Sequence, residues 1–297
     1  MVNTLRNQVL ALPIKGTASW LAFLLLLLNA PLAVYAANID RAAQIEQLYL
    51  QSGIQDAIAQ FPSILKEGVA SSAAESEHST RYTQQVTEII ERTIDVDDLG
   101  SQVKQHLNSK LSSEHVDSIL AWLMSPLGQK VVKLETTAAT MAGFEEMSAQ
   151  TVTLQKQYKG TPREKLFENF DRATRTTEAA LETAMAVQLA LVGAFADAGQ
   201  GAGMPDYAML TEMVEANRFM TRGLIGQQVF TNYLYTYRTL NDDELKRYIR
   251  FAESPAGLRY FSALNEALRS ALIAPSKEIG RSILQEALGD ISVPPAE

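Results

Sequence analysis

The sequence predicts an all-α protein built from two tandem copies of a helical unit, each centred on a helix–Ser-Pro-x-Gly–helix turn. Three observations lead to this prediction. From residue 37 onward, apolar residues recur three and four positions apart, which is the period of one face of a helix. No segment shows the period-two alternation of a half-buried strand. A window over residues 111–136 then recurs 129 positions later, over residues 240–265.

The first 36 residues have the composition of a secretory signal. Arg6 and Lys15 precede an unbroken apolar run from Trp20 to Leu28, and no acidic residue occurs up to Ala36. This run is shorter than the roughly 20 residues needed to cross a bilayer. We therefore expect residues 1–36 to be a cleaved signal peptide, and the mature chain to be periplasmic or secreted. The alternative is an inner-membrane anchor over residues 18–37.

Composition excludes several kinds of chemistry. The 297 residues include no Cys, so disulfides, thiolate metal sites and a cysteine nucleophile are excluded. The formal net charge is −8, whereas nucleic-acid binding is driven by Lys and Arg that meet phosphates. We expect no nucleic-acid partner, and membrane contact only through the signal segment if it stays uncleaved.

Each of the two repeated windows is predicted to open on a capped helix. Ser112 and Asn241 stand where a side-chain oxygen can accept a free backbone N–H of the first turn. Glu244 can complete a capping box in the second copy by accepting the N–H of Asn241. His115 at the matching position of the first copy is not expected to make this reciprocal bond. The apolar stripe then falls at the same four positions in both copies: Val116, Ile119, Leu120 and Leu123, then Leu245, Tyr248, Ile249 and Ala252.

A Ser-Pro-x-Gly turn follows each of these helices. Serine can cap the next helix, and proline is well tolerated at the first helical position. A recurring glycine in the first turn indicates that another backbone packs close to it. We predict a structural role, not a catalytic one, for six residues: Ser125, Pro126, Gly128, Ser254, Pro255 and Gly257. The basic residue two places later, Lys130 or Arg259, suits a surface ion pair.

The two windows resemble the bacterial exported family known as domain of unknown function 2059. The resemblance rests on L-S-S-E-H-V and M-S-P-L-G-Q-K in the first copy, and on L-N-D-D-E-L and E-S-P-A-G-L-R in the second. His115 departs from the acidic residue that is usual in the family. The resemblance implies an exported all-helical domain, and it implies no catalytic residues because the family has no established activity.

A boundary between the copies is expected near Gly160. Glycine can end a helix in the left-handed conformation, and Thr161-Pro162-Arg163-Glu164 can restart one as a capping box. Copy one is therefore predicted over residues 37–160 and copy two over residues 161–297.

The candidate metal and phosphate motifs are weak. Asp95 to Gly100 is acidic but lacks calcium ligands at the required spacing, so a capping turn is the expected role. The three histidines, His78, His106 and His115, lack the spacing of a helical metal pair. The glycines at 199, 201 and 203 follow a helical run, with no strand before them. No catalytic residue, cofactor or metal is predicted.

Two apolar patterns remain. Phe230, Tyr233, Leu234 and Tyr237 form an aromatic stripe that is expected to pack in the core, with a ligand-stacking face as the alternative. A second set could line an adaptable groove or simply fill the core: Met204, Met209, Met213 and Met220.

The function predicted from these features is a non-enzymatic, exported module that binds another protein or an envelope component. Two alternatives stay open. One is a hydrolase-type enzyme whose acidic site assembles only in the folded chain, and the other is a carrier of apolar small molecules.

Overall fold

The computed structural model describes residues 40–73, 79–198 and 207–291, and every regular element among them is a helix. The all-α prediction is confirmed. Residues 40–51 are helical, and the helices that follow are α2 (Ile54–Ala73), α3 (Ser79–Thr93), α4 (Val96–Lys110), α5 (Ser113–Leu123), α6 (Pro126–Ala138), α7 (Met141–Tyr158), α8 (Pro162–Thr174), α9 (Thr176–Ala198), α10 (Tyr207–Ala216), α11 (Arg218–Thr236), α12 (Asp242–Ala252) and α13 (Pro255–Ile291).

The predicted signal segment, residues 1–36, lies outside the described residues. Within the described ranges, no helix combines the length and apolar character needed to span a bilayer.

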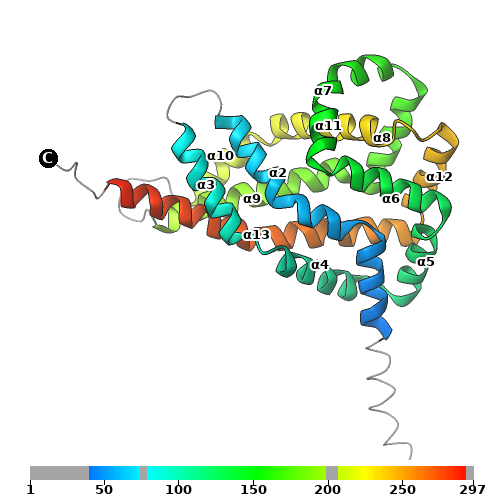
Figure 1. Cartoon of the computed structure of the whole chain (residues 1–297), viewed down its shortest axis with the longest axis horizontal. Helices are drawn as coiled ribbons and strands as arrows, with labels where there is room; N and C mark the ends of the chain where they lie inside the picture. Colours follow the sequence, from blue (N-terminus) through cyan, green and yellow to red (C-terminus); the bar gives the residue numbers. More distant parts are fainter. Residues whose placement is uncertain (1–39, 74–78, 199–206, 292–297) are drawn as a thin grey trace, which may run out of the picture. The chain divides into compact units, whose positions relative to one another are not determined.

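The described residues from 45 onward form one compact unit, and residues 40–44 belong to a separate one. The long helix α13 contacts α9, α4, α3 and α5 within the larger unit, and Figure 1 shows α9 and α4 on either side of it. Four of its buried positions are alanines, whose small side chains let neighbouring helices approach closely: Ala256, Ala263, Ala267 and Ala271.

Two hydrophobic cores lie inside this unit. The first joins buried residues of α2–α5 to Tyr260 and the alanines of α13. The second joins α6 and α7 to α8, α11 and α12. Trp122, Phe251 and Phe261 pack against both cores. Each core thus draws residues from both sides of Gly160, the predicted boundary between the copies.

The two windows also contact each other at matching positions. The rings of Trp122 and Phe251, which are 129 residues apart, stack with centroids 4.1 Å apart and an interplanar angle of 9°. Lys130 Nζ lies 2.8 Å from Glu244 Oε1, so the basic residue of the first turn pairs with the capping carboxylate of the second window. Arg259 is exposed and has no ion-pair partner among the described residues.

The cap at α5 differs from the prediction. Ser112 Oγ accepts the His115 N–H at 3.2 Å, and His115 Nδ1 accepts the Ser112 N–H at 3.3 Å, so a complete capping box is present. A neutral imidazole nitrogen is an acceptor and replaces the carboxylate that Glu244 supplies at α12. The expectation that the first copy lacks the reciprocal bond of the capping box was wrong.

The Ser-Pro-x-Gly turns have the same geometry in both windows. Ser125 Oγ accepts the Gly128 N–H at 3.1 Å and donates to Trp122 O at 2.6 Å. Ser254 Oγ makes the equivalent bonds to Gly257 and Phe251, at 3.1 and 2.7 Å. Pro126 and Pro255 are the first residues of α6 and α13.

The close backbone beside each glycine belongs to the preceding helix, and not to a more distant one. A Cβ on Gly128 would lie 2.1 Å from Trp122 O, and one on Gly257 would lie 2.0 Å from Phe251 O. A third turn of this kind, which sequence analysis missed, joins α6 to α7. There Thr140 Oγ1 accepts the Gly143 N–H at 3.1 Å and donates to the Thr137 carbonyl oxygen.

The junction at Gly160 also differs in detail. Gly160 has a positive φ of 74°, but Thr161 makes no side-chain cap bond to α8. Glu164 Oε2 instead accepts the Gly160 N–H at 2.6 Å. The capping box predicted for Thr161 and Glu164 is therefore replaced by a bond one residue earlier.

Candidate docking surface

Exposed apolar side chains concentrate on one face of α10 and α11. Met213, Met220 and Leu224 are 57%, 62% and 64% exposed, and Phe219 beside them is 89% exposed. We define the methionine face as this outer row, with Phe219 on its flank: Met209, Met213, Ala216, Met220, Gly223 and Leu224, all of them exposed. On α10, Met209, Met213 and Ala216 are four and three residues apart, so they lie on one side of that helix. On α11, Gly223 and Leu224 follow Met220 by three and four residues and share its side.

The opposite side of the same helices packs inward. The partly buried residues there are Thr211, Val214, Thr221, Ile225 and Val229. They lie on the side where α10 and α11 contact α9 and where α11 contacts α7. Asn217 separates α10 from α11, and its ψ of −2° departs from the helical value of about −42°.

Charges of both signs lie on the same helices as the methionine face. Arg218 Nη1 lies 3.6 Å from Glu215 Oε2, and Arg222 lies 2.5 Å from Glu178 Oε1 of α9. Arg222 therefore reaches toward α9, on which α11 packs, and not toward the methionine face. The methionine face is thus an apolar row on helices that carry mixed charge.

The predicted methionine and aromatic sets separate in the structure. Met209, Met213 and Met220 lie on the exposed face, whereas Met204 lies outside the described residues. Tyr233, Leu234 and Tyr237 of the aromatic stripe are buried in the second core, and Phe230 packs against it. The methionines and the aromatic residues thus face different surroundings, although both recur at helical spacing.

Three tyrosines at the end of α11 each donate to a carboxylate on a different helix. Tyr233 reaches Asp171 Oδ1 of α8 at 3.2 Å, and Tyr235 reaches Glu146 Oε2 of α7 at 2.6 Å. Tyr237 reaches Glu135 Oε1 of α6 at 2.6 Å. These contacts span 62 to 102 residues of sequence, so no local motif could have predicted them.

Glu135 is the carboxylate with the most unusual environment among these. It accepts a second bond from the Tyr248 hydroxyl at 2.8 Å. Burial raises the pKa of Glu135 above its ordinary 4.5, although the hydrogen bonds from Tyr237 and Tyr248 act in the opposite direction. Burial and the nearby Glu135 also raise the pKa of both tyrosines. The group is a packed polar cluster that links α6, α11 and α12.

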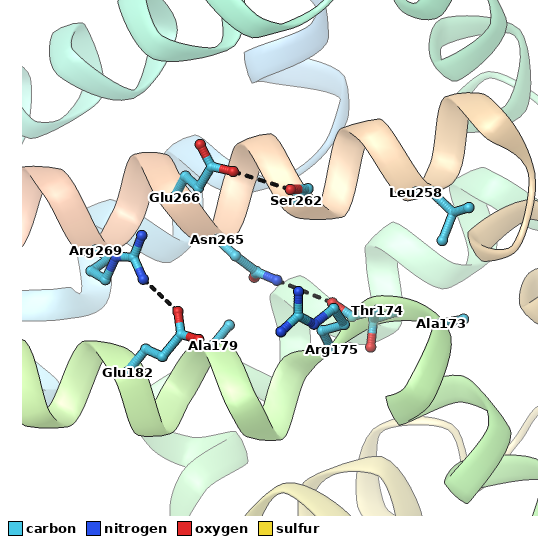
Figure 2. A pocket seen from close by; sticks show the side chains of 10 residues that line it. All are labelled: Ala173, Thr174, Arg175, Ala179, Glu182, Leu258, Ser262, Asn265, Glu266 and Arg269. Carbon is cyan, nitrogen blue, oxygen red and sulfur yellow. Dashed lines mark hydrogen bonds and ion pairs between the residues drawn. The ribbon is translucent and has the colours of Figure 1, made fainter. Parts of the chain in front are cut away.

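A pocket of about 150 Å³ lies between the α8–α9 junction and α13. Figure 2 shows Glu182 directed at Arg269, with which it forms an ion pair, and Asn265 donating to Thr174 O. Glu266, on the same wall, lies 2.9 Å from Lys110 Nζ, and this contact lowers its pKa. Both pocket carboxylates are therefore held by cations in ion pairs that join helices.

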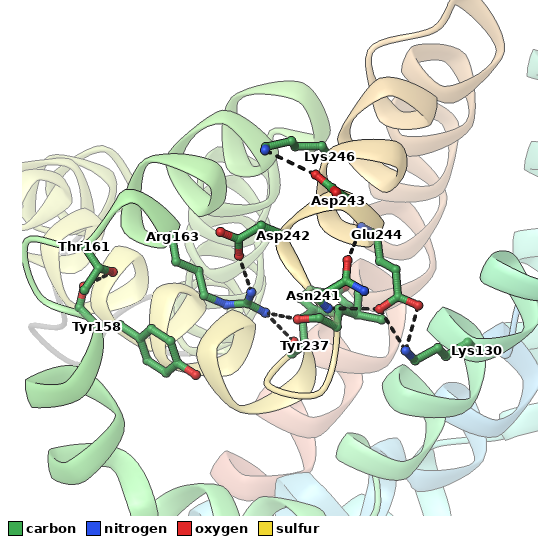
Figure 3. A network of polar contacts seen from close by, with 11 residues as sticks. Lys130, Tyr158, Thr161, Arg163, Tyr237, Asn241, Asp242, Asp243, Glu244 and Lys246 are labelled. Carbon is green, nitrogen blue, oxygen red and sulfur yellow. Dashed lines mark hydrogen bonds and ion pairs between the residues drawn. The ribbon is translucent and has the colours of Figure 1, made fainter.

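A second polar network ties the ends of α11 and α12 to α8. Arg163 donates to Asp242 Oδ1 and to the carbonyl oxygens of Tyr237 and Leu240, at 2.7 to 2.8 Å, and its side chain is 12% exposed. Figure 3 shows this arginine reaching across to the loop that precedes α12. Sequence analysis placed Arg163 only as part of a helix start.

The remaining residues considered as metal ligands do not lie close together. Asp95 Oδ1 accepts the N–H groups of Asp97 and Asp98 and so caps α4. His106 Nε2 lies 3.5 Å from Glu266, His115 completes the α5 cap, and His78 lies outside the described residues, as do residues 199–203. Within the described ranges, no cluster of three His, Asp or Glu residues could hold a metal ion.

Comparison of the chain with protein-family models, with curated proteins and with solved structures found no match.

Proposed function

We propose that this chain is an exported, non-enzymatic helical module that binds another protein through the methionine face. The observation that carries the proposal is the contiguous exposed row on α10 and α11. Contiguous apolar patches on a soluble protein commonly mark binding sites, because exposing them to water is unfavourable. Methionine side chains are flexible and polarisable, which suits contact with an apolar partner.

The charges of α10 and α11 favour a protein partner over a lipid surface. Helices that lie on membranes usually carry Lys and Arg along the polar face. These two helices instead carry Glu212 and Glu215 as well as Arg218 and Arg222, and the whole chain has a net charge of −8. The ion pairs of Glu182 and Glu266 support a packing role for the pocket carboxylates, so we place the hydrolase-type alternative second.

Export is part of the same proposal. It is supported by the basic start, the short apolar run from Trp20 to Leu28 and the small residue Ala36. Membership of the domain of unknown function 2059 family is supported by the two Ser-Pro-x-Gly windows. Protein sequencing of envelope material should find a mature N-terminus at Ala37. An intact chain embedded in the membrane would favour the anchor over residues 18–37.

Photo-crosslinking in intact cells tests the docking role. A photoreactive amino acid is placed at Met213 and, as the matched control, at Val152, which is 64% exposed on α7 but outside the methionine face. We expect a discrete protein adduct from position 213 and none from position 152. Adding Met220→Glu should remove the adduct, because a charge on the face opposes burial.

The proposal fails if position 213 gives no protein adduct at normal expression levels. It also fails if Met220→Glu leaves the adduct unchanged while the folded protein accumulates normally. Mass spectrometry of the adduct identifies the partner, including a second copy of this chain.

A further inference from the structure

The pocket between the α8–α9 junction and α13 contains an arginine with an unusual backbone conformation. Arg175 has φ 55° and ψ 30°, which is the left-handed region, and no other non-glycine residue in the described ranges has a positive φ. Helices commonly end in this conformation on glycine, which has no Cβ to clash. An arginine is therefore kept here at a cost in stability, so we look for a role of its side chain that glycine could not fill.

The guanidinium group of Arg175 lines the pocket and has no partner there. Figure 2 shows it between α9 and α13, near the carboxamide of Asn265. It forms no hydrogen bond or ion pair with the described residues. Asn265 donates to Thr174 O at 3.0 Å and so ties α13 to the end of α8, which holds the two walls of the pocket together. All five N–H donors of the arginine are therefore free for a ligand.

The charges around the pocket also favour an anion. Glu182 pairs with Arg269, and Glu266 pairs with Lys110. Because these four groups balance one another, neither pocket carboxylate compensates the charge of Arg175. This arginine also directly precedes α9, and the first-turn N–H groups of a helix carry partial positive charge. An anion beside Arg175 would gain from both.

The two ends of the pocket differ in polarity. Figure 2 shows Leu258 and Ala173 at one end, the pair of Glu182 and Arg269 at the other, and Arg175 between them. Leu258 is 48% exposed although its side chain is large and apolar. Covering it would be favourable, because apolar surface would be removed from water. The pocket therefore offers a site for an anionic group beside an apolar wall.

We infer that this pocket binds a small organic acid, with its carboxylate on Arg175 and its apolar chain over Ala173 and Leu258. A carboxylate has two coplanar oxygens that match two parallel N–H groups of a guanidinium fork. The pocket volume is about 150 Å³, and a cavity of that size holds a molecule as large as benzene. An acid of about six carbon atoms therefore fits. The inference does not depend on the methionine face, which lies on other helices.

Isothermal titration calorimetry of the purified mature chain tests the ligand class, with hexanoate as the probe. Hexanamide has the same length without the charge, and inorganic phosphate has charge without the chain. We expect both to bind about tenfold more weakly than hexanoate, or worse. A chain that takes up no hexanoate at about 10 mM, well above a Kd of about 1 mM, would overturn the inference. Equal affinity for hexanoate and either of the other two probes would also overturn it.

Two substitutions test the contacts. Arg175→Gln should raise the Kd for hexanoate by about tenfold, because a charge-assisted pair is lost. Arg172→Gln is the matched control, since it removes the same charge from an exposed position on α8 that does not line the pocket. Leu258→Ser should weaken hexanoate binding and leave acetate binding unchanged. Equal effects of the two arginine variants on hexanoate binding would reject the assigned contact.

Arg175→Gly separates ligand binding from folding. Glycine adopts a positive φ without strain, so this variant should unfold at the same temperature as the wild type or at a higher one. It should nevertheless lose hexanoate binding as Arg175→Gln does. If Arg175→Gly unfolds at a clearly lower temperature in the absence of ligand, the guanidinium group stabilises the fold itself, and the inference is wrong.

Discussion

Glu135 brings a carboxylate into contact with two buried phenols, and the two states of this carboxylate differ in stability. The neutral acid suits the buried surroundings, whereas the anion loses hydration that only two hydrogen bonds replace. The folded chain therefore holds the proton more tightly than the unfolded chain, whose pKa is the ordinary 4.5. The stabilisation is fully present below that pH and is lost as pH rises through the raised pKa.

Replacement of Glu135 by Gln removes the cost of burying an ionised carboxylate. Glutamine is neutral at every pH and keeps an oxygen that can accept from Tyr237 and Tyr248. We expect Glu135→Gln to increase the free energy of unfolding at pH 7, with little effect at pH 4. Urea denaturation at both pH values measures the difference.

Glu146 is a control for which the same substitution should change stability at pH 7 in the opposite direction. Its hydrogen bond from Tyr235 lowers its pKa, so its stabilisation is present above pH 4.5 and is lost as pH falls through the lowered pKa. Glu146→Gln should therefore decrease stability at pH 7. If both variants shift stability in the same direction at pH 7, the assignment of Glu135 as a destabilised anion is wrong.

At the scale of helices, the Ser-Pro-x-Gly turns depend on the absence of a side chain. Glycine inside a helix usually costs about 0.5–1 kcal/mol relative to alanine. At Gly128 and Gly257 this rule should reverse, because a Cβ would press against the carbonyl oxygens of Trp122 and Phe251, at 2.1 and 2.0 Å. The turn can close only if the first residues of the new helix pack on the last turn of the old one.

We therefore expect Gly128→Ala and Gly257→Ala to lower the free energy of unfolding by about 1–3 kcal/mol each. Gly226→Ala on α11 is the matched control, since its Cβ would meet only Thr177 Cγ2 at 3.6 Å. That variant should be neutral or slightly stabilising. Thermal unfolding of the three proteins checks the prediction, and it is contradicted if Gly128→Ala is as stable as Gly226→Ala.

Arg163 holds two helix ends through the shape of its guanidinium group. It donates to one carboxylate and to two carbonyl oxygens at once, which the compact ammonium group of the shorter lysine side chain cannot reproduce. Arg163→Lys should cost about 2 kcal/mol, whereas Arg259→Lys, at an exposed position, should cost almost nothing. Chemical denaturation compares the two, and equal stabilities would show that charge alone matters at Arg163.

Sequence patterns predicted where helices form better than which helix faces are buried and which residues they contact. Spacing, caps and proline predicted the all-α class, because these signals act within a few residues. They could not show that Met213 faces solvent while Tyr233 is buried, since both belong to helical stripes. They also missed the partners of Arg163 and Glu135, which come from distant helices. Only the packing of the whole chain decides which face of a helix is covered.

At the scale of the whole molecule, the two predicted copies share their cores. The first core needs α13 from beyond Gly160, and the second needs α6 and α7 from before it. Trp122 and Phe251 stack between the windows and pack against both cores. Neither segment can therefore bury its own apolar surface when the other is absent, so the described unit over residues 45–291 should unfold cooperatively.

Trp122 provides the measurement of this cooperativity. The chain has two tryptophans, and Trp20 lies in the proposed signal segment, so Trp122 is the intrinsic probe of the mature protein. Its fluorescence and the far-ultraviolet circular dichroism should report the same urea midpoint, as in two-state unfolding. Phe251→Ala should lower both midpoints together, because it reduces the free energy of unfolding by about 3 kcal/mol. The exposed Val152→Ala should move neither midpoint. Two separated dichroism transitions, with fluorescence following only one, would mean that the copies unfold independently, and that the Trp122–Phe251 stack does not couple them.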